Sequence, residues 1–214
     1  MRCPLRFGPN LHAGTGTVAK VYEAGSNQAG SDVSYTADTV FEIRLMPDGS
    51  VHYAAGRAVF FISSKKVVWP LHVGAVISSV QDVAFSHVQY LDQLPPAPPA
   101  VASPSPSPPI DIKPPPPLPP GDYVVFTDAS ADLVTSPGAV SRVLGPAGWN
   151  AAVWSDEDIW AASGPRKGIS FRCPLSVGAK MIGFVRGAFK ETSSYSDLEF
   201  SLYCAQYWPI HHAN

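Results

Sequence analysis

The first 94 residues alternate between apolar and polar positions in six short runs. Each run is rich in Val, Ile, Phe or Tyr, and turn-forming stretches such as "GSNQAGSD", "PDG" and "WP" separate the runs. Alternation with a period of two is typical of β-strands, whose successive side chains point to opposite faces. The sequence therefore predicts strands within residues 17–25, 39–46, 50–56, 58–64, 71–79 and 80–91.

The run "VFEIRL" shows this alternation most clearly. Phe41, Ile43 and Leu45 fall on one face, and Glu42 and Arg44 fall on the other. This arrangement predicts an antiparallel strand with one solvated face. The following "MPDGSV" predicts a hairpin, because an Asp-Gly pair readily adopts the positive φ angles of a tight turn.

The residues after position 120 follow the same pattern, and no convincing helical period occurs anywhere in the chain. Short strands separated by turn signals every 8–12 residues or so are typical of a β-sandwich or barrel. We therefore expect an all-β protein, with further strands within residues 122–128, 148–155, 158–163, 168–175, 180–187 and 197–208.

A proline-rich stretch divides the two strand-forming segments, with 14 of the 23 prolines between Pro95 and Pro120. Proline fixes φ and lacks an amide donor, so this stretch predicts a polyproline II rod of about 3.1 Å per residue. It is either an inert spacer, or a glycosylated rod or ligand for aromatic grooves. The candidates for O-linked sugar are Ser103, Pro104, Ser105, Pro106, Ser107, Pro108, Pro109, Pro114, Pro115, Pro116 and Pro117.

Two groups of motifs resemble a concanavalin A-like lectin/glucanase jelly-roll module. "GTGTVAKVYEAG", "YTADTVFEIRLMPDGSVHYAAGRAVFFISS" and "PLHVGAVISSVQDVAFSHVQY" resemble the rear of such a module. "GWNAAVWSDEDIWAASGPRKGISFRCP", "KMIGFVRG" and "SSYSDLEFSLYCA" resemble its front, and "RCPL" occurs in both segments. The resemblance implies jelly-roll halves at residues 1–94 and 121–214, joined by the 95–120 rod, and a link to sugar binding.

Half a sandwich exposes an unpaired edge and an apolar face, so each segment needs a complement. The halves could unite within one chain, as in a circular permutant, or between chains, head to tail. The sequence could also be a window of a longer array or an imperfect gene, in which case Met1 is not the mature start. A stiff rod joins nearby points poorly, which favours the head-to-tail homopolymer over intramolecular closure.

The composition of the chain bears on which kinds of partner it can have. The chain is 45% hydrophobic and 15% charged with a net charge of -2, which gives no reason to expect nucleic acid. No apolar run approaches the roughly 20 residues of a membrane span. Cys173 and Cys204 lie near the ends of two predicted strands and form a candidate disulfide, with Cys3 unpaired or intermolecular. The alternative is three reduced, buried thiols.

Few residues suggest chemistry. Asp197 and Glu199 lie two apart, as a retaining carboxylate pair could, but the outer acids of the glucanase pattern are missing. The acids at 156–158 suit an exposed turn or weak calcium ligands, and His211-His212 lie at the terminus. No Ser-His-Asp arrangement can be read. We therefore expect no catalytic, cofactor or metal site.

These features favour an extracellular structural glycoprotein, in a cell wall, matrix or surface filament, that assembles head to tail and carries glycans. The alternative is a carbohydrate-binding module, an adhesin or a virus-fibre domain that recognises cell-surface glycans. Aromatic residues in jelly rolls mostly fill the core, but a surface pair could stack on a sugar ring or a proline rod. The candidates for stacking are Trp149, Trp154, Trp160 and Trp208, in a segment that also contains Tyr195 and Tyr203.

Overall fold

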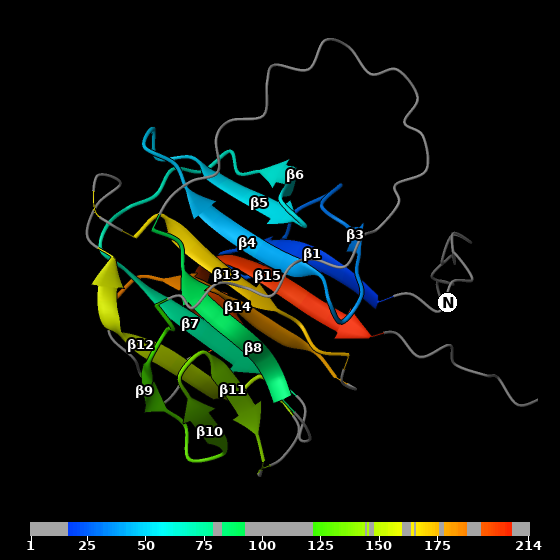
Figure 1. Ribbon diagram of the computed structural model, residues 1–214, viewed down its shortest axis with the longest axis vertical. Coiled ribbons are helices and arrows are strands. Elements are labelled where there is room, and N and C mark those ends of the chain that lie inside the picture. Colours follow the sequence, from blue (N-terminus) through cyan, green and yellow to red (C-terminus); the bar gives the residue numbers. More distant parts are fainter. Residues whose placement is uncertain are drawn as a thin grey trace, which may run out of the picture.

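Two antiparallel sheets pack face to face in the computed structural model of the chain (Figure 1). The structure describes residues 17–78, 83–92, 122–143, 145, 148–159, 164, 166–175, 178–187 and 194–206. Their one helical element is a 3-10 turn, η1 (Tyr195–Asp197). The predicted all-β class and β-sandwich are confirmed. None of the described residues belongs to a helix that could span a membrane.

The strands are divided between an eight-stranded and a seven-stranded sheet. The eight-stranded sheet runs in the order β2 (Ser26–Asn27), β1 (Thr17–Glu23), β15 (Leu198–Gln206), β14 (Lys180–Val185), β7 (Leu71–Ile77), β12 (Ala151–Ile159) and β9 (Phe126–Ala129), with β3 (Val33–Ser34) also paired to β1. The seven-stranded sheet runs in the order β10 (Leu133–Ser136), β11 (Ala139–Arg142), β8 (Val83–Tyr90), β13 (Gly168–Arg172), β4 (Val40–Leu45), β5 (Val51–Ala55) and β6 (Ala58–Ile62).

The two segments on either side of the proline-rich stretch interleave in both sheets. Strand β7 lies between β14 and β12, and β13 lies between β8 and β4. Strands β1 and β15 pair, as do β8 and β11. The sandwich is therefore completed within a single chain, which is the intramolecular alternative. The head-to-tail completion that the sequence favoured is not how this sandwich is built, because the strands that each segment lacks come from the same chain.

The described residues that flank the proline-rich stretch lie together. The Arg166 guanidinium binds Asp92, just before the stretch, at 2.8 Å and Asp122, just after it, at 2.7 Å. The guanidinium also lies 4.4 Å from the centroid of the Tyr90 ring. The chain therefore leaves the first segment and enters the second at neighbouring points, Asp92 and Asp122, although a stiff rod between them was expected to favour distant ones. The polyproline II prediction for 95–120 and its sugar-bearing candidates lie outside the described residues.

The core fills the space between the sheets and is closed by a disulfide. Phe171 of β13 packs against Phe41 and Phe85, with ring centroids 5.9 Å apart in each pair. Cys173, directly after β13, is bonded to Cys204 of β15, so the bond joins the two sheets. The predicted disulfide is confirmed, and Cys3 lies outside the described residues.

Strand β4 departs from its prediction on one face. Phe41, Ile43 and Leu45 are fully buried in the core, as predicted. Glu42 and Arg44 point away from it but are only 8% and 5% exposed, so the predicted solvated face is wrong. Strand β4 is flanked by β13 and β5, and the two side chains pair with each other at 2.7 Å. A partnered ion pair can be covered where a lone charge could not.

The Asp-Gly hairpin between β4 and β5 is confirmed. Gly49 has φ 80°, and Met46 N–H donates to the Ser50 carbonyl at 2.9 Å. A second hairpin, β10–β11, was not predicted from the sequence; it turns at Gly138 with φ 70°. Its turn, "SPG", is an ordinary signal, but its strands are only four residues long.

Cleavage within residues 95–120 should leave the two pieces associated. No disulfide among the described residues joins the pieces, but six strand pairs do: β1·β15, β14·β7, β7·β12, β11·β8, β8·β13 and β13·β4. After limited proteolysis, size-exclusion chromatography should show one species near 22.8 kDa, which separates only in denaturant. Pieces that elute separately without denaturant, or large assemblies of the uncut chain, would contradict intramolecular completion.

Removing the disulfide should destabilise the sandwich without changing its fold. The bond spans 31 residues, and a cross-link of that length contributes about 3–4 kcal/mol by restricting the unfolded chain. The double variant Cys173→Ser/Cys204→Ser should lose roughly this free energy of unfolding in urea titrations. Reduced wild type is the control and should match the double variant. Equal stability of the oxidised wild type and the variant would show that the bond does not form.

Candidate functional site

The outer face of the eight-stranded sheet carries a second apolar cluster. An antiparallel sheet usually turns one polar face to water. Here, six side chains on that face are buried. They come from β7, β12, β14 and β15, and they are Val76, Ala152, Trp154, Met181, Val185 and Leu198. These residues are buried because other side chains cover them, and the partly buried ones packed against them are Tyr22, Trp149, Tyr195 and Tyr203.

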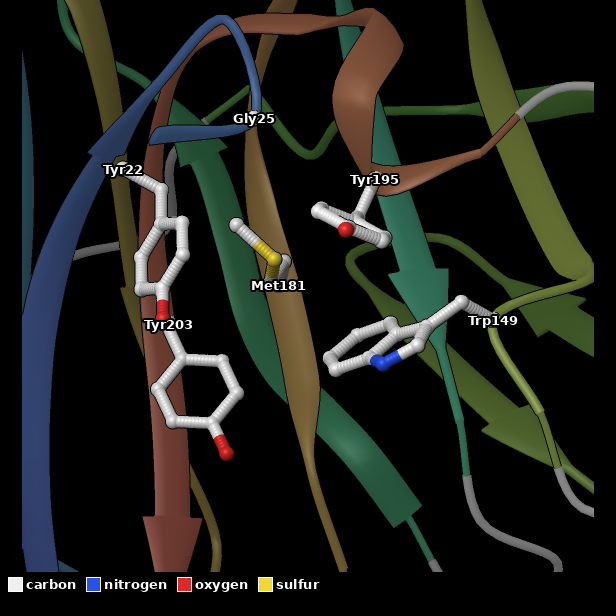
Figure 2. Close-up of a pocket in the computed structure, with 6 residues that line it drawn as sticks. All are labelled: Tyr22, Gly25, Trp149, Met181, Tyr195 and Tyr203. Atoms are coloured by element: carbon white, nitrogen blue, oxygen red, sulfur yellow. The ribbon is translucent and has the colours of Figure 1, made fainter. Parts of the chain in front are cut away.

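Four aromatic rings surround a groove over this cluster. The groove has a volume of about 230 Å³ and is lined by Tyr22, Gly25, Trp149, Met181, Tyr195 and Tyr203. Figure 2 shows Met181 in the middle, with Tyr22 and Tyr203 on one side and Trp149 and Tyr195 on the other. None of the six residues is charged.

The rings lie at stacking distance from one another. The Tyr22 and Tyr203 centroids are 5.4 Å apart, and those of Trp149 and Tyr195 are 5.3 Å apart. Trp149 and Tyr203 lie 6.0 Å apart across the groove. All three pairs are tilted, by 43° to 55°, and their centroid distances fall within the roughly 4.5–7 Å range of interacting aromatic pairs. The four aromatic side chains are half-buried, so they remain accessible to a ligand.

Strand alternation positions two of the rings. In β1, Val21 points into the core, so Tyr22 points out. In β15, Leu202 points into the core and Tyr203 points out, opposite Met181 of β14. The groove floor is therefore a direct result of period-two side-chain geometry.

A glycine turn places the third ring. Gly25, with φ 76°, follows β1, and a Cβ atom there would lie 3.2 Å from Cα of Ser196. This close approach brings the η1 turn against the end of β1. Asp197 holds the turn by accepting a hydrogen bond from Ser194 N–H at 2.6 Å. Tyr195 thereby overhangs the groove.

The structure separates the four tryptophan candidates. Trp149 lines the groove. Trp154 lies beneath the surface, 2% exposed, with its ring where a Gly74 side chain would otherwise be. Trp160 and Trp208 lie outside the described residues. Tyr22 and Met181 were not predicted as site residues, although the alternation in "TVAKVYE" already directs Tyr22 away from the core.

The acidic candidates are engaged in local contacts. Asp197 caps the η1 turn, and Glu199 forms an ion pair with Arg186. Glu157 pairs with Arg166 at 3.1 Å, and Asp158 contacts His72 at 2.7 Å. Among the described residues, no group of three or more His, Cys, Asp or Glu side chains could hold a metal ion. His211 and His212 lie outside them.

The hairpin after β4 brings an Asp, a Ser and a His together. The Ser50 hydroxyl donates to Asp48 Oδ1 at 2.6 Å and lies 3.2 Å from His52 Nε2. In a hydrolytic triad, the histidine lies between the other two residues and takes the serine proton. Here Ser50 lies between His52 and Asp48 and donates to the carboxylate. The three residues are therefore not arranged as in a triad.

This cluster instead shifts two pKa values. Hydrogen bonds from the Ser50 hydroxyl and backbone N–H, followed by the effect of Lys66, lower the pKa of Asp48 to about 2. Partial burial lowers the pKa of His52. The hydrogen bonds to Asp48 favour its charged form and therefore stabilise the hairpin near neutral pH, whereas the burial of His52 only disfavours its protonated form.

None of the protein families, curated proteins and solved structures compared with the chain matches it.

The Asp48 carboxyl should titrate with a pKa of about 2, against an ordinary value of 3.8. Since the pKa is lowered on folding, the stability that Asp48 contributes is present above about pH 4 and is lost as pH falls toward 2. NMR titration of the carboxyl carbon measures the pKa. Ser50→Ala should raise it toward 3.8, whereas an unshifted wild-type value would show that the hydrogen bonds are not formed in solution.

Proposed function

We propose that the chain is an extracellular β-sandwich glycoprotein that binds neutral carbohydrate through the aromatic groove. One observation supports this most directly: four aromatic rings surround an uncharged groove on the solvent side of a sheet. The proposal follows the carbohydrate-binding alternative from the sequence. It is also in keeping with the resemblance to concanavalin A-like modules.

The chemistry of the groove suits a sugar ring. A pyranose presents apolar C–H faces, which an aromatic face can cover, and a rim of hydroxyl groups. Tyrosine and tryptophan combine a large apolar surface with a hydrogen-bonding group at one end. The tilted pairs, Tyr22 with Tyr203 and Trp149 with Tyr195, offer two such surfaces on either side of Met181.

The volume of the groove and its uncharged lining indicate which ligands fit it. The groove, at about 230 Å³, is smaller than the roughly 300–1,000 Å³ of sites for drug-sized molecules. It therefore suits one ring of a glycan rather than a long oligosaccharide. A charged sugar would lose hydration without gaining an opposite charge from the lining residues, so the groove favours a neutral one.

The disulfide and the proline-rich stretch support the extracellular setting. Disulfides persist in oxidising compartments, and Cys173–Cys204 joins the two sheets. Binding a glycan on a neighbouring molecule would hold this protein in a coat or matrix without any exchange of strands. A polymer built by head-to-tail strand completion loses its rationale, because the complementary strands meet within one chain.

The test compares alanine variants of the groove on an array of neutral and acidic glycans, followed by calorimetry with the best neutral ligand. Trp149→Ala and Tyr203→Ala should each weaken binding about tenfold or more, equivalent to about 1.4 kcal/mol. Tyr123→Ala is the matched control, since Tyr123 is 42% exposed and does not line the groove. It should bind as wild type.

Three outcomes would overturn the proposal. The first is that no neutral glycan binds. The second is that acidic glycans bind best. The third is that a peptide covering the chain's own proline-rich stretch binds in the groove and no sugar does.

A further inference from the structure

Arg142 is buried beside the groove and is bonded on both sides of Trp149. Its side chain is completely inaccessible to solvent, in β11 of the seven-stranded sheet. One guanidinium nitrogen donates to the Gly148 carbonyl at 2.8 Å, and the other donates to Asn150 Oδ1 at 3.0 Å. The residues immediately before and after Trp149 thus share one guanidinium.

The same guanidinium is anchored to the rest of the sandwich. It donates to the Ile77 carbonyl at the end of β7 at 2.8 Å and pairs with Asp132 at 3.2 Å. Gly148 N–H also donates to the Ser78 carbonyl at 2.8 Å. Arg142 therefore connects the Trp149 turn to both sheets.

These contacts fix the backbone around Trp149, because Trp149 lies in the turn before β12 and not within a strand. Within a strand, ladder hydrogen bonds fix the backbone, but at residues 148–150 they are replaced by the contacts to Arg142 and Ser78. A guanidinium carries five N–H donors in a rigid planar fork, whereas a lysine ammonium is a flexible point charge. Several acceptors in different directions require the arginine.

We infer that Arg142 is a positioning residue for ligand recognition: it holds the Trp149 ring at the groove wall, against Tyr195 and Tyr203. The expected effect of Arg142 on glycan binding rests on the proposed function. Its expected effect on the position of the Trp149 ring rests only on the hydrogen bonds around Trp149. A residue with only a structural role would lower stability and leave the ring and the binding of folded protein unchanged.

The experiment uses the full chain labelled with 5-fluorotryptophan, and Trp149→Phe assigns the Trp149 resonance in the ¹⁹F NMR spectrum. Arg142→Lys keeps the charge beside Asp132 but loses the fork. It should shift or broaden the Trp149 resonance and leave that of Trp154, buried within the sheet face, unchanged. Arg186→Lys is the matched control, because Arg186 pairs with Glu199 and does not line the groove. It should leave both resonances unchanged.

Glycan affinity supplies the second readout. Arg142→Lys should weaken binding about tenfold, as expected when bonds to a charged group are lost. In the Trp149→Ala background it should cause no further loss, because the ring that it positions is gone. Additive losses, or an unchanged Trp149 resonance in folded Arg142→Lys, would overturn the inference.

If Arg142→Lys does not fold, a milder variant still tests the inference. Asn150→Ala removes one acceptor from an exposed residue, and it should move the Trp149 resonance and weaken binding about threefold. An unchanged resonance in this variant would overturn the inference. If wild type binds no glycan, the proposed function fails, while the ¹⁹F spectra still decide whether Arg142 positions Trp149.

Discussion

Hydrogen bonding between strands from opposite ends of the chain is the constraint on which the structure depends. Strand β7 has no neighbour from its own segment, because both of its partners, β14 and β12, come after residue 120. Strand β13 is likewise enclosed by β8 and β4. The core and the groove both require this interleaving, since each combines residues from both segments.

Local patterns predicted the strands well because the determining property is local. Period-two alternation identified β1, β4, β5 and β7 and the Asp-Gly hairpin, and it directed Phe41 and Ile43 into the core. Pairing across the chain could not be predicted in this way, since no local feature of β7 specifies β14 as its neighbour. The burial of Glu42 and Arg44 on the outer face of β4 was missed for the same reason. The alternation of charged and apolar residues does not show which strands flank β4.

The groove was even less predictable from the sequence than the strand pairing. Its lining comes from β1 and the turn after it, the turn before β12, β14, η1 and β15. Trp149 was a candidate because tryptophan is conspicuous in any sequence. Its dependence on Arg142 was not visible, because the guanidinium reaches it through carbonyl groups and an amide that only the folded chain brings together.

The shared attachment of Asp92 and Asp122 to Arg166 has a consequence for how such a gene can vary. An insertion whose two ends are neighbours can grow or shrink without altering the host sandwich. Doubling the length of a flexible insertion raises the entropic cost of closing it by only about 0.6 kcal/mol. The number of residues between Asp92 and Asp122 can therefore change while the domain that carries them stays folded.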